Sequence, residues 1–402
     1  MIGLAYCDMA GRIYYDESRT PLADGGIVRE CSAEELIPAP EGAMPMVLPG
    51  RRPLLKEGIA KRRFVLAAVL PAGYTRLLLP AYVREETAPP LPLFGYTFAC
   101  VVDDRLHVAA MRTDEAEEWQ PRSFLAGELE SRIEARVSED PLNRVLRQVA
   151  LCSTEYGCFT AQNVFLGQGE AALPVSPKCN ARCVGCISEL EPSAGLPSPQ
   201  TRIGFEVSAE ELARVAVSHL QRVPDGIVSF GQGCEGEPLL RSVTIAKAIE
   251  LIRSQHSAGT INLNTNGSMP SALQRCIDAG LDAVRISLNS FRQRAYAAYY
   301  RPLGYSLDDV FESVRLASNA KLRLSLNLLT HPGVTDDEEE IGAMEELLSG
   351  VRVDMIQTRT LNIDPEWYFG AVGRPKKPLG MRWAVQRIRA AGVRVGNFTH
   401  TH

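Results

Sequence analysis

Residues 284–289 read VRISLN, and this alternation of apolar and polar side chains decides the fold class. Successive side chains of a strand point to opposite faces, so the apolar residues share one face and the polar residues share the other. INLNTN at 261–266 and LRLSLNL at 322–328 alternate in the same way. An open doubly wound sheet would bury both faces and make both apolar. One polar face per strand predicts a barrel whose interior holds ligand or water, because buried polar groups without partners are costly.

Short strands and helices alternate from about Leu173 onward. Ser208 and Ser306 each precede an acidic residue by three positions, the pattern of a capping box that begins a helix. Repeated strand-helix units predict a partial, TIM-like (β/α)6 barrel with a parallel sheet, followed by a C-terminal helix and strand. An alternative is that the polar faces form internal hydrogen-bond ladders in a filled barrel. Strands are expected at 227–230, 260–264, 283–288, 322–328, 354–358 and 393–397.

The first part of the chain has a different pattern. Strand-like segments are divided by Pro and Gly, and residues 123–147 are largely helical in pattern. The expected strands are 64–70, 75–83, 96–102 and 106–111. We therefore expect an α/β chain in two parts, a smaller α+β accessory domain over residues 1–165 and the barrel over residues 166–402.

The composition is that of a globular protein. The chain has 402 residues, of which 45% are hydrophobic and 23% are charged, and its formal net charge is −5. An acidic balance without a long basic run disfavours non-specific nucleic-acid binding. No apolar run is long enough to span a membrane, and the start of the chain lacks a basic and apolar signal, so we expect a cytoplasmic protein.

The strongest chemical motif is KCNARCVGC at residues 178–186. Cys179, Cys183 and Cys186 have the C-x-x-x-C-x-x-C spacing that can hold one [4Fe-4S] cluster and leave the fourth iron open to another ligand. Structural zinc is the first alternative, but zinc sites usually have two C-x-x-C halves or nearby histidines. The histidines of this chain do not cluster near the loop, so a cluster is favoured.

This cysteine loop resembles that of the radical S-adenosylmethionine (radical SAM) superfamily, and the resemblance covers roughly residues 173–397. The superfamily also carries a Gly-Gly-Glu-Pro motif after the second strand, which holds the ammonium of the cofactor. Gly236, Glu237 and Pro238 match that motif, while Glu235 replaces its first glycine. A cofactor with a free ammonium group calls for a carboxylate and exposed backbone carbonyls, which such a turn supplies.

Two further motifs resemble the superfamily's contacts to the ribose and carboxylate of the cofactor. Asn264 and Asn266 follow the third strand, and Ser287 and Asn289 follow the fourth. Each lies at a carboxyl end of a strand, where α/β barrels keep their sites. Gly185 departs from the superfamily, in which the residue before the third cysteine is usually bulky and packs beside adenine. Candidates for that packing are Val184, Ile187 and Phe230.

The resemblance implies reductive cleavage of S-adenosylmethionine at the cluster, giving methionine and a 5′-deoxyadenosyl radical that removes hydrogen from a small-molecule or peptide substrate. It also implies a flavodoxin- or ferredoxin-like reductant. Because Arg301, Gln357 and Arg359 are expected near the barrel mouth, we hypothesise that the substrate has an anionic group. Arg285 and Arg323 lie deeper and are expected to pair with internal acids.

Two alternatives remain open from the residues alone. An iron-sulfur electron carrier or sensor would change redox state without cleaving the cofactor. Cys152 and Cys158 precede the barrel and could ligate a second cluster with cysteines of the first part of the chain. Those cysteines are Cys7, Cys31 and Cys100.

Overall fold

The computed structural model describes residues 2–8, 10–60, 62–114, 124 and 127–397. Within these ranges the C-terminal part forms one parallel sheet in which strands adjacent in the sequence are also adjacent in space. Its strands are β15 (Glu170–Leu173), β16 (Ile227–Phe230), β17 (Thr260–Thr265), β18 (Ala283–Leu288), β19 (Arg323–Thr330), β20 (Met355–Thr360) and β21 (Arg394–Gly396). β15 and β21 are the edges of the sheet, as in a partial barrel, and the predicted fold class is confirmed.

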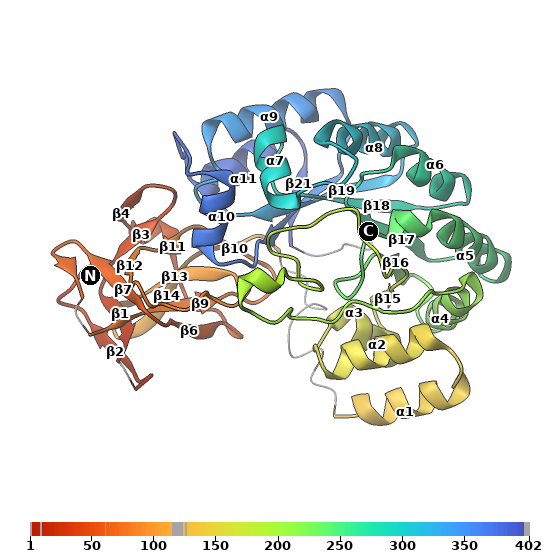
Figure 1. The fold of residues 1–402 in the computed structure, drawn as a ribbon, viewed down its shortest axis with the longest axis horizontal. Helices are drawn as coiled ribbons and strands as arrows, with labels where there is room; N and C mark the ends of the chain where they lie inside the picture. The colour runs from red at the N-terminus through yellow and green to blue at the C-terminus, as the bar shows by residue number, and fades with distance from the viewer. Residues whose placement is uncertain (1, 9, 61, 115–123, 125–126, 398–402) are drawn as a thin grey trace.

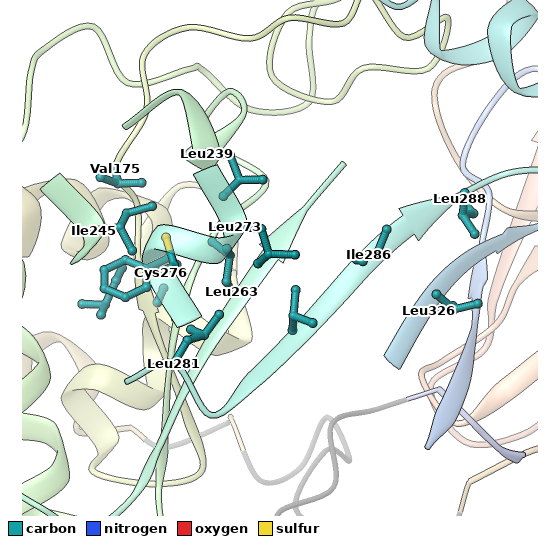
Figure 2. Packing of buried hydrophobic residues seen from close by; sticks show 14 of the residues in the cluster. Val175, Leu239, Ile245, Leu263, Leu273, Cys276, Leu281, Ile286, Leu288 and Leu326 are labelled. Atoms are coloured by element: carbon teal, nitrogen blue, oxygen red, sulfur yellow. The ribbon is translucent and has the colours of Figure 1, made fainter. Parts of the chain in front are cut away.

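Helices cover the outside of this curved sheet (Figure 1). They are α4 (Ala209–Arg222), α5 (Ser242–Gln255), α6 (Pro270–Asp278), α7 (Gln293–Tyr300), α8 (Leu307–Asn319), α9 (Glu338–Gly350), α10 (Pro365–Val372) and α11 (Met381–Ala390). The apolar strand faces pack under these helices, and Figure 2 shows Leu263, Ile286 and Leu326 within that core. The opposite faces line two open cavities, one at each end of the barrel strands, so the alternation of the strands has the predicted effect.

Hydrogen bonds between polar side chains fill the middle of the barrel. Arg285 Nη1 lies 2.7 Å from Glu170 Oε1 in a buried ion pair, and the Ser229 hydroxyl also donates to Glu170. Asn262 Nδ2 donates to Ser229 Oγ at 3.0 Å. Arg285 therefore pairs with an internal acid as predicted. The middle of the barrel contains hydrogen-bonded polar side chains, as in the alternative of a filled barrel. An open cavity lies above it at the carboxyl ends of the strands.

Short antiparallel strands make up the first part of the chain. They are β1 (Leu4–Cys7), β2 (Ile13–Asp16), β3 (Leu22–Asp24), β4 (Val28–Glu30), β5 (Leu36–Pro38), β6 (Met44–Leu48), β7 (Arg51–Leu55), β8 (Gly58–Ile59), β9 (Phe64–Val69), β10 (Tyr74–Arg76), β11 (Leu79–Pro80), β12 (Tyr82–Arg84), β13 (Tyr96–Val102) and β14 (Arg105–Arg112). The single strand predicted at 75–83 was wrong, since β10, β11 and β12 pair in different sheets. Pro80 has no N–H to donate, which limits how far a strand can pair there.

Three helices connect the two parts, α1 (Leu129–Glu139), α2 (Arg144–Thr154) and α3 (Phe159–Leu166). The predicted helical segment 123–147 is interrupted around Pro141, and its predicted start at Ser123 lies outside the described residues. Val145, Val149 and Phe165 share the main hydrophobic core with the barrel. The domain boundary after residue 165 stays a prediction.

Buried polar contacts attach the first part of the chain to β20 and α10. The Arg51 guanidinium lies 3.2 Å from the Asp364 carboxylate, and both side chains are buried. Arg76 Nη2 donates to the carbonyl oxygen of Leu361 at 2.8 Å, directly after β20. Because unpaired buried charges are costly, these contacts hold the N-terminal sheets beside the carboxyl ends of the barrel strands.

Glu211 stabilises the packing of α2 on α4 through two contacts. It closes the predicted capping box by accepting the Ser208 N–H at 3.0 Å, and it pairs with Arg144 at 2.8 Å. The hydrogen bond from Arg144 is the largest cause that lowers the Glu211 pKa from 4.5 to about 2. A lowered carboxylate pKa adds stability that is present above the ordinary pKa and is lost as the pH falls through the folded value.

Glu211→Gln is expected to lower the free energy of unfolding by about 1–2 kcal/mol at pH 7. The difference from wild type should shrink between pH 4.5 and about 2, the range over which the folded protein alone keeps this carboxylate charged. Urea titrations at several pH values measure it. Glu210→Gln, at an exposed neighbouring position, is the control and should cost less than about 0.5 kcal/mol. A pH-independent difference would contradict the assignment.

Candidate functional site

A cavity of about 660 Å³ lies at the carboxyl ends of the barrel strands. It brings together segments that are far apart in the sequence: the cysteine loop, the glycine-rich turn after β16 and the ends of β17 to β20. The sequence-predicted site residues that line it are Cys179, Cys183, Cys186, Gly236, Glu237, Pro238, Asn264, Asn266, Ser287, Gln357 and Arg359. The carboxyl ends of parallel strands meet at one edge, which explains why separate motifs converge there.

Backbone hydrogen bonds hold the cysteine loop against the end of α7. The Arg182 N–H donates to the Tyr300 carbonyl at 3.0 Å, and the Val184 N–H donates to the Tyr299 carbonyl at 2.9 Å. The Leu303 N–H donates back to the Asn180 carbonyl at 2.9 Å. These backbone hydrogen bonds fix the conformation of the loop, so the positions of the three thiols do not depend on contacts between the sulfurs.

The environment of the three thiols suits a bound cationic cluster. Burial raises the pKa of Cys179 to about 11, and burial followed by the neighbouring thiols raises the pKa of Cys183. Without a metal the Cys179 and Cys183 sulfurs are therefore neutral, and a bound metal would stabilise their thiolate forms. Arg202 Nη2 lies 3.6 Å from Cys186 Sγ, so a positive charge that also pairs with Glu189 lies beside the three sulfurs. Within the described ranges, no three His, Cys, Asp or Glu side chains are arranged around a single-ion site.

The glycine-rich turn packs directly on the backbone before and inside the cysteine loop. The Gly236 N–H donates to the Ser176 carbonyl at 2.7 Å, and the Glu237 N–H donates to the Lys178 carbonyl at 2.8 Å. A Cβ atom at position 236 would lie 2.0 Å from the Lys178 oxygen. Position 236 therefore requires glycine because the two backbones touch.

Both glutamates of the turn are held by hydrogen bonds within the protein. The Glu235 carboxylate accepts the N–H groups of Val175, Ser176 and Gln232 at 2.7–2.8 Å. Glu237 accepts N–H groups from Leu239 and Asn266 and the Thr265 hydroxyl. Burial, the largest cause, raises the pKa of Glu235 to about 8 and that of Glu237 to about 7. These side chains connect the turn to the cysteine loop and to the end of β17.

The predicted asparagine and serine residues divide between the cavity and the protein interior. Asn264 donates to the Gly231 carbonyl at 2.8 Å, and Asn266 donates to Asn180 at 2.9 Å, so each connects a strand end to a loop of the site. Ser287 lines the cavity. Asn289 is fully buried and donates to the Ala295 carbonyl and the Tyr368 hydroxyl. The structure therefore does not bring Asn289 to the cavity.

Among the predicted substrate contacts, Gln357 and Arg359 line the cavity but Arg301 does not. Arg301 lies on the surface, where its guanidinium pairs with Glu191 at 2.9 Å. Its expected place at the mouth rested on its position after the fourth strand, and the left-handed backbone there, with φ of 45°, ends α7.

The three candidates for adenine packing also divide. Ile187 lines the cavity, whereas neither Val184 nor Phe230 does, and Phe230 is fully buried. At Gly185, a Cβ atom would lie 3.2 Å from the Tyr299 hydroxyl. Tyr299 therefore fills the space beside the third cysteine.

Several lining residues were missed by the sequence analysis. Glu170, Asn327, Tyr299 and Asn362 belong to the cavity wall, and Ala72 reaches it from the N-terminal part. The position of Asn327 on the polar face of LRLSLNL was the one available signal. The place of Glu170 in the site depends on its pairing with Arg285, 115 residues away.

The remaining cysteines fall into separate groups. Cys31 and Cys100 lie in one core of the N-terminal sheets, and Cys7 lies in another. Cys152 and Cys158 line a small pocket together with Cys234. The second ligand set considered from the sequence is therefore not assembled among the described residues.

Comparison with known proteins finds a family match over the segment that contains the cysteine loop and the glycine-rich turn. Residues 173–344 match the family model of the radical SAM superfamily. They include the cysteine loop, the glycine-rich turn and the ends of β17, β18 and β19, while β20 with Gln357 and Arg359 lies beyond the matched residues.

Residues 173–344 form a radical SAM domain.

The cofactors of this superfamily are a [4Fe-4S] cluster and S-adenosylmethionine, which confirms the cofactor prediction. The chain is 32% identical over 168 residues to GTP 3′,8-cyclase of Heliobacterium modesticaldum, covering 41% of this chain and 47% of that protein. It is 25% identical over 244 residues to the FeMo cofactor biosynthesis protein NifB of Klebsiella pneumoniae, covering 57% and 51% of the two chains. It thus spans about half the length of these curated relatives.

Among solved structures, the radical SAM methyltransferase from Sphaerobacter thermophilus is similar with a TM-score of 0.40. The two are 13% identical, and the match covers 56% of this chain and 64% of that one. Within the described ranges, no helix is both long and apolar enough to cross a bilayer.

Proposed function

We propose that this chain is an enzyme that cleaves S-adenosylmethionine reductively and uses the resulting radical to remove hydrogen from a substrate in the barrel lumen. The observation that carries the proposal is the convergence of Cys179, Cys183 and Cys186 with the turn at 231–238 on one cavity. When bound, the cluster would pass one electron to the sulfonium, so that a carbon–sulfur bond breaks to give methionine and a 5′-deoxyadenosyl radical.

The protein's own residues would bind and orient the cluster and S-adenosylmethionine and shield them from water. Cys179, Cys183 and Cys186 would supply three thiolates, and Arg202 would balance their charge from 3.6 Å. The backbone around Gly236 and Pro238 lines the cavity and would accept the ammonium of the cofactor, with the turn held in shape by Glu235 and Glu237.

The ribose of S-adenosylmethionine and the substrate would bind in different parts of the cavity at the carboxyl ends of the strands. Asn264, Asn266 and Ser287 line it at the ends of neighbouring strands and would contact the ribose or carboxylate. Because the lumen below is filled by the hydrogen-bonded ladder around Glu170, the substrate would enter from the carboxyl end. We further propose a small-molecule or peptide substrate, a flavodoxin- or ferredoxin-like reductant, and a cytoplasmic location.

Anaerobic reconstitution with iron and sulfide, followed by dithionite and S-adenosylmethionine, tests the proposal. We expect 5′-deoxyadenosine and methionine in equal amounts, slowly without substrate and faster with it. A cluster that reduces and reoxidises without forming 5′-deoxyadenosine would instead identify an electron carrier or sensor. Cys183→Ser is the control for cleavage by free iron and dithionite.

A further inference from the structure

Most of the charged side chains around the cavity have an ion-pair or hydrogen-bond partner within the protein, but they differ in the kind of partner. The charged residues that line it, within the described part of the chain, are Glu170, Glu235, Glu237, Arg285 and Arg359. Glu170 pairs with Arg285 at 2.7 Å, and Glu235 and Glu237 accept hydrogen bonds from neighbouring N–H and hydroxyl groups. All three carboxylates are thus engaged elsewhere.

Arg359 is the remaining cation. Its Nη1 donates to the Asn397 carbonyl at 2.9 Å, and no carboxylate lies within 4.0 Å of its guanidinium among the described residues. The side chain is exposed to the cavity although the preceding residue, Thr358, is buried. The positive charge of Arg285 repels that of Arg359, and an anion placed here would offset this repulsion.

The wall beside Arg359 is polar as well. Arg359 lies two residues beyond Gln357 on the same face of β20, and Gln357 is in register with Asn327 of β19. All three residues line the cavity, and the Asn327 Oδ1 atom is buried without a hydrogen-bond partner. An unpaired buried acceptor is costly, so a ligand here is expected to carry a hydrogen-bond donor for Asn327 in addition to any group that Arg359 binds.

We propose that Arg359 binds an anionic oxygen group, a carboxylate or a phosphate, of a small-molecule substrate. This proposal rests on the proposed function and specifies its substrate class. A guanidinium has five N–H donors in a planar fork, and one bond to Asn397 leaves a pair free for bidentate binding of either group.

The test measures anion binding apart from turnover. Anaerobically reconstituted wild type, Arg359→Gln, Arg359→Lys and the surface control Arg301→Gln are titrated with inorganic phosphate or acetate at constant ionic strength, with the thermal midpoint as readout. Wild type and Arg301→Gln should gain stability in a saturable way. Arg359→Gln should bind about tenfold more weakly or worse, and Arg359→Lys should fall between because it keeps the charge but not the fork. Saturation with phosphate alone, acetate alone or both identifies the group.

The affinity for S-adenosylmethionine, measured by equilibrium dialysis, separates substrate from cofactor. We expect it to stay within about twofold of wild type in Arg359→Gln. A loss of about tenfold or more would overturn the proposal by assigning Arg359 to the cofactor's own carboxylate. Equal anion responses in wild type and Arg359→Gln, or none in wild type, would also overturn it. Absence of 5′-deoxyadenosine with intact anion binding would contradict the proposed function and not this site.

Discussion

Cys183→Ser is expected to abolish cluster binding and with it the formation of 5′-deoxyadenosine. A serine hydroxyl is a poor ligand for an iron-sulfur cluster, and two thiolates would remain. Iron should fall from about four atoms per chain to less than about one, with loss of the visible absorbance of the cluster. Iron and sulfide analysis after anaerobic reconstitution measures the effect.

The matched control is Cys158→Ser. Cys158 is half-buried and lines the same cavity but lies outside the predicted cysteine loop. Its iron content should equal that of wild type. Loss of iron in Cys158→Ser, or retention of iron in Cys183→Ser, would contradict the assignment of ligands.

Gly236→Val is expected to separate the glycine-rich turn from the cysteine loop. Its Cβ would lie 2.0 Å from the Lys178 oxygen and 2.3 Å from the Lys178 carbonyl carbon, so one backbone must move. Overpacking of this kind should lower the free energy of unfolding by about 3 kcal/mol. The displaced turn should also weaken S-adenosylmethionine binding by more than about tenfold. Urea titration and equilibrium dialysis measure the two effects.

Gly204→Val controls for the loss of a glycine. A Cβ at position 204 meets no atom within 4 Å, so this variant should keep both cofactor affinity and stability close to wild type. Normal cofactor affinity in Gly236→Val would show that the contact between the two backbones is dispensable.

The barrel could be predicted because its signals are local. The strand expected at 283–288, which contains most of VRISLN, has the bounds of β18, and the capping box at Ser208 marked the start of α4. A hydroxyl followed by acidic residues also occurs at Thr335, but α9 begins three residues later, at Glu338. The Thr335 hydroxyl accepts the His331 N–H at 2.9 Å instead, which stabilises a turn. A hydroxyl followed by acidic residues fits a turn as well as a cap.

Residue spacing identified motifs that the structure places on one cavity, whereas the position of side chains that depend on tertiary pairing could not be predicted from the sequence. The cysteine loop and the turn around Gly236 are recognised from their spacing. Arg301 and Asn289 follow the right strand but turn to the surface and to the interior. The three short strands β10, β11 and β12 each pair with a distant partner, which no local pattern records.

The attachment of the N-terminal sheets to β20 affects how this enzyme can diversify. Arg76 bonds the backbone at Leu361, two residues beyond the proposed anchor at Arg359, and Arg51 neutralises Asp364 just after it. The first part of the chain therefore cannot be removed or exchanged freely. Without Arg51, the buried Asp364 carboxylate would lose its ion-pair partner close to the cavity. Substitutions in the N-terminal sheets that do not contact the substrate are therefore expected to change substrate preference. They would shift β20, which carries Arg359.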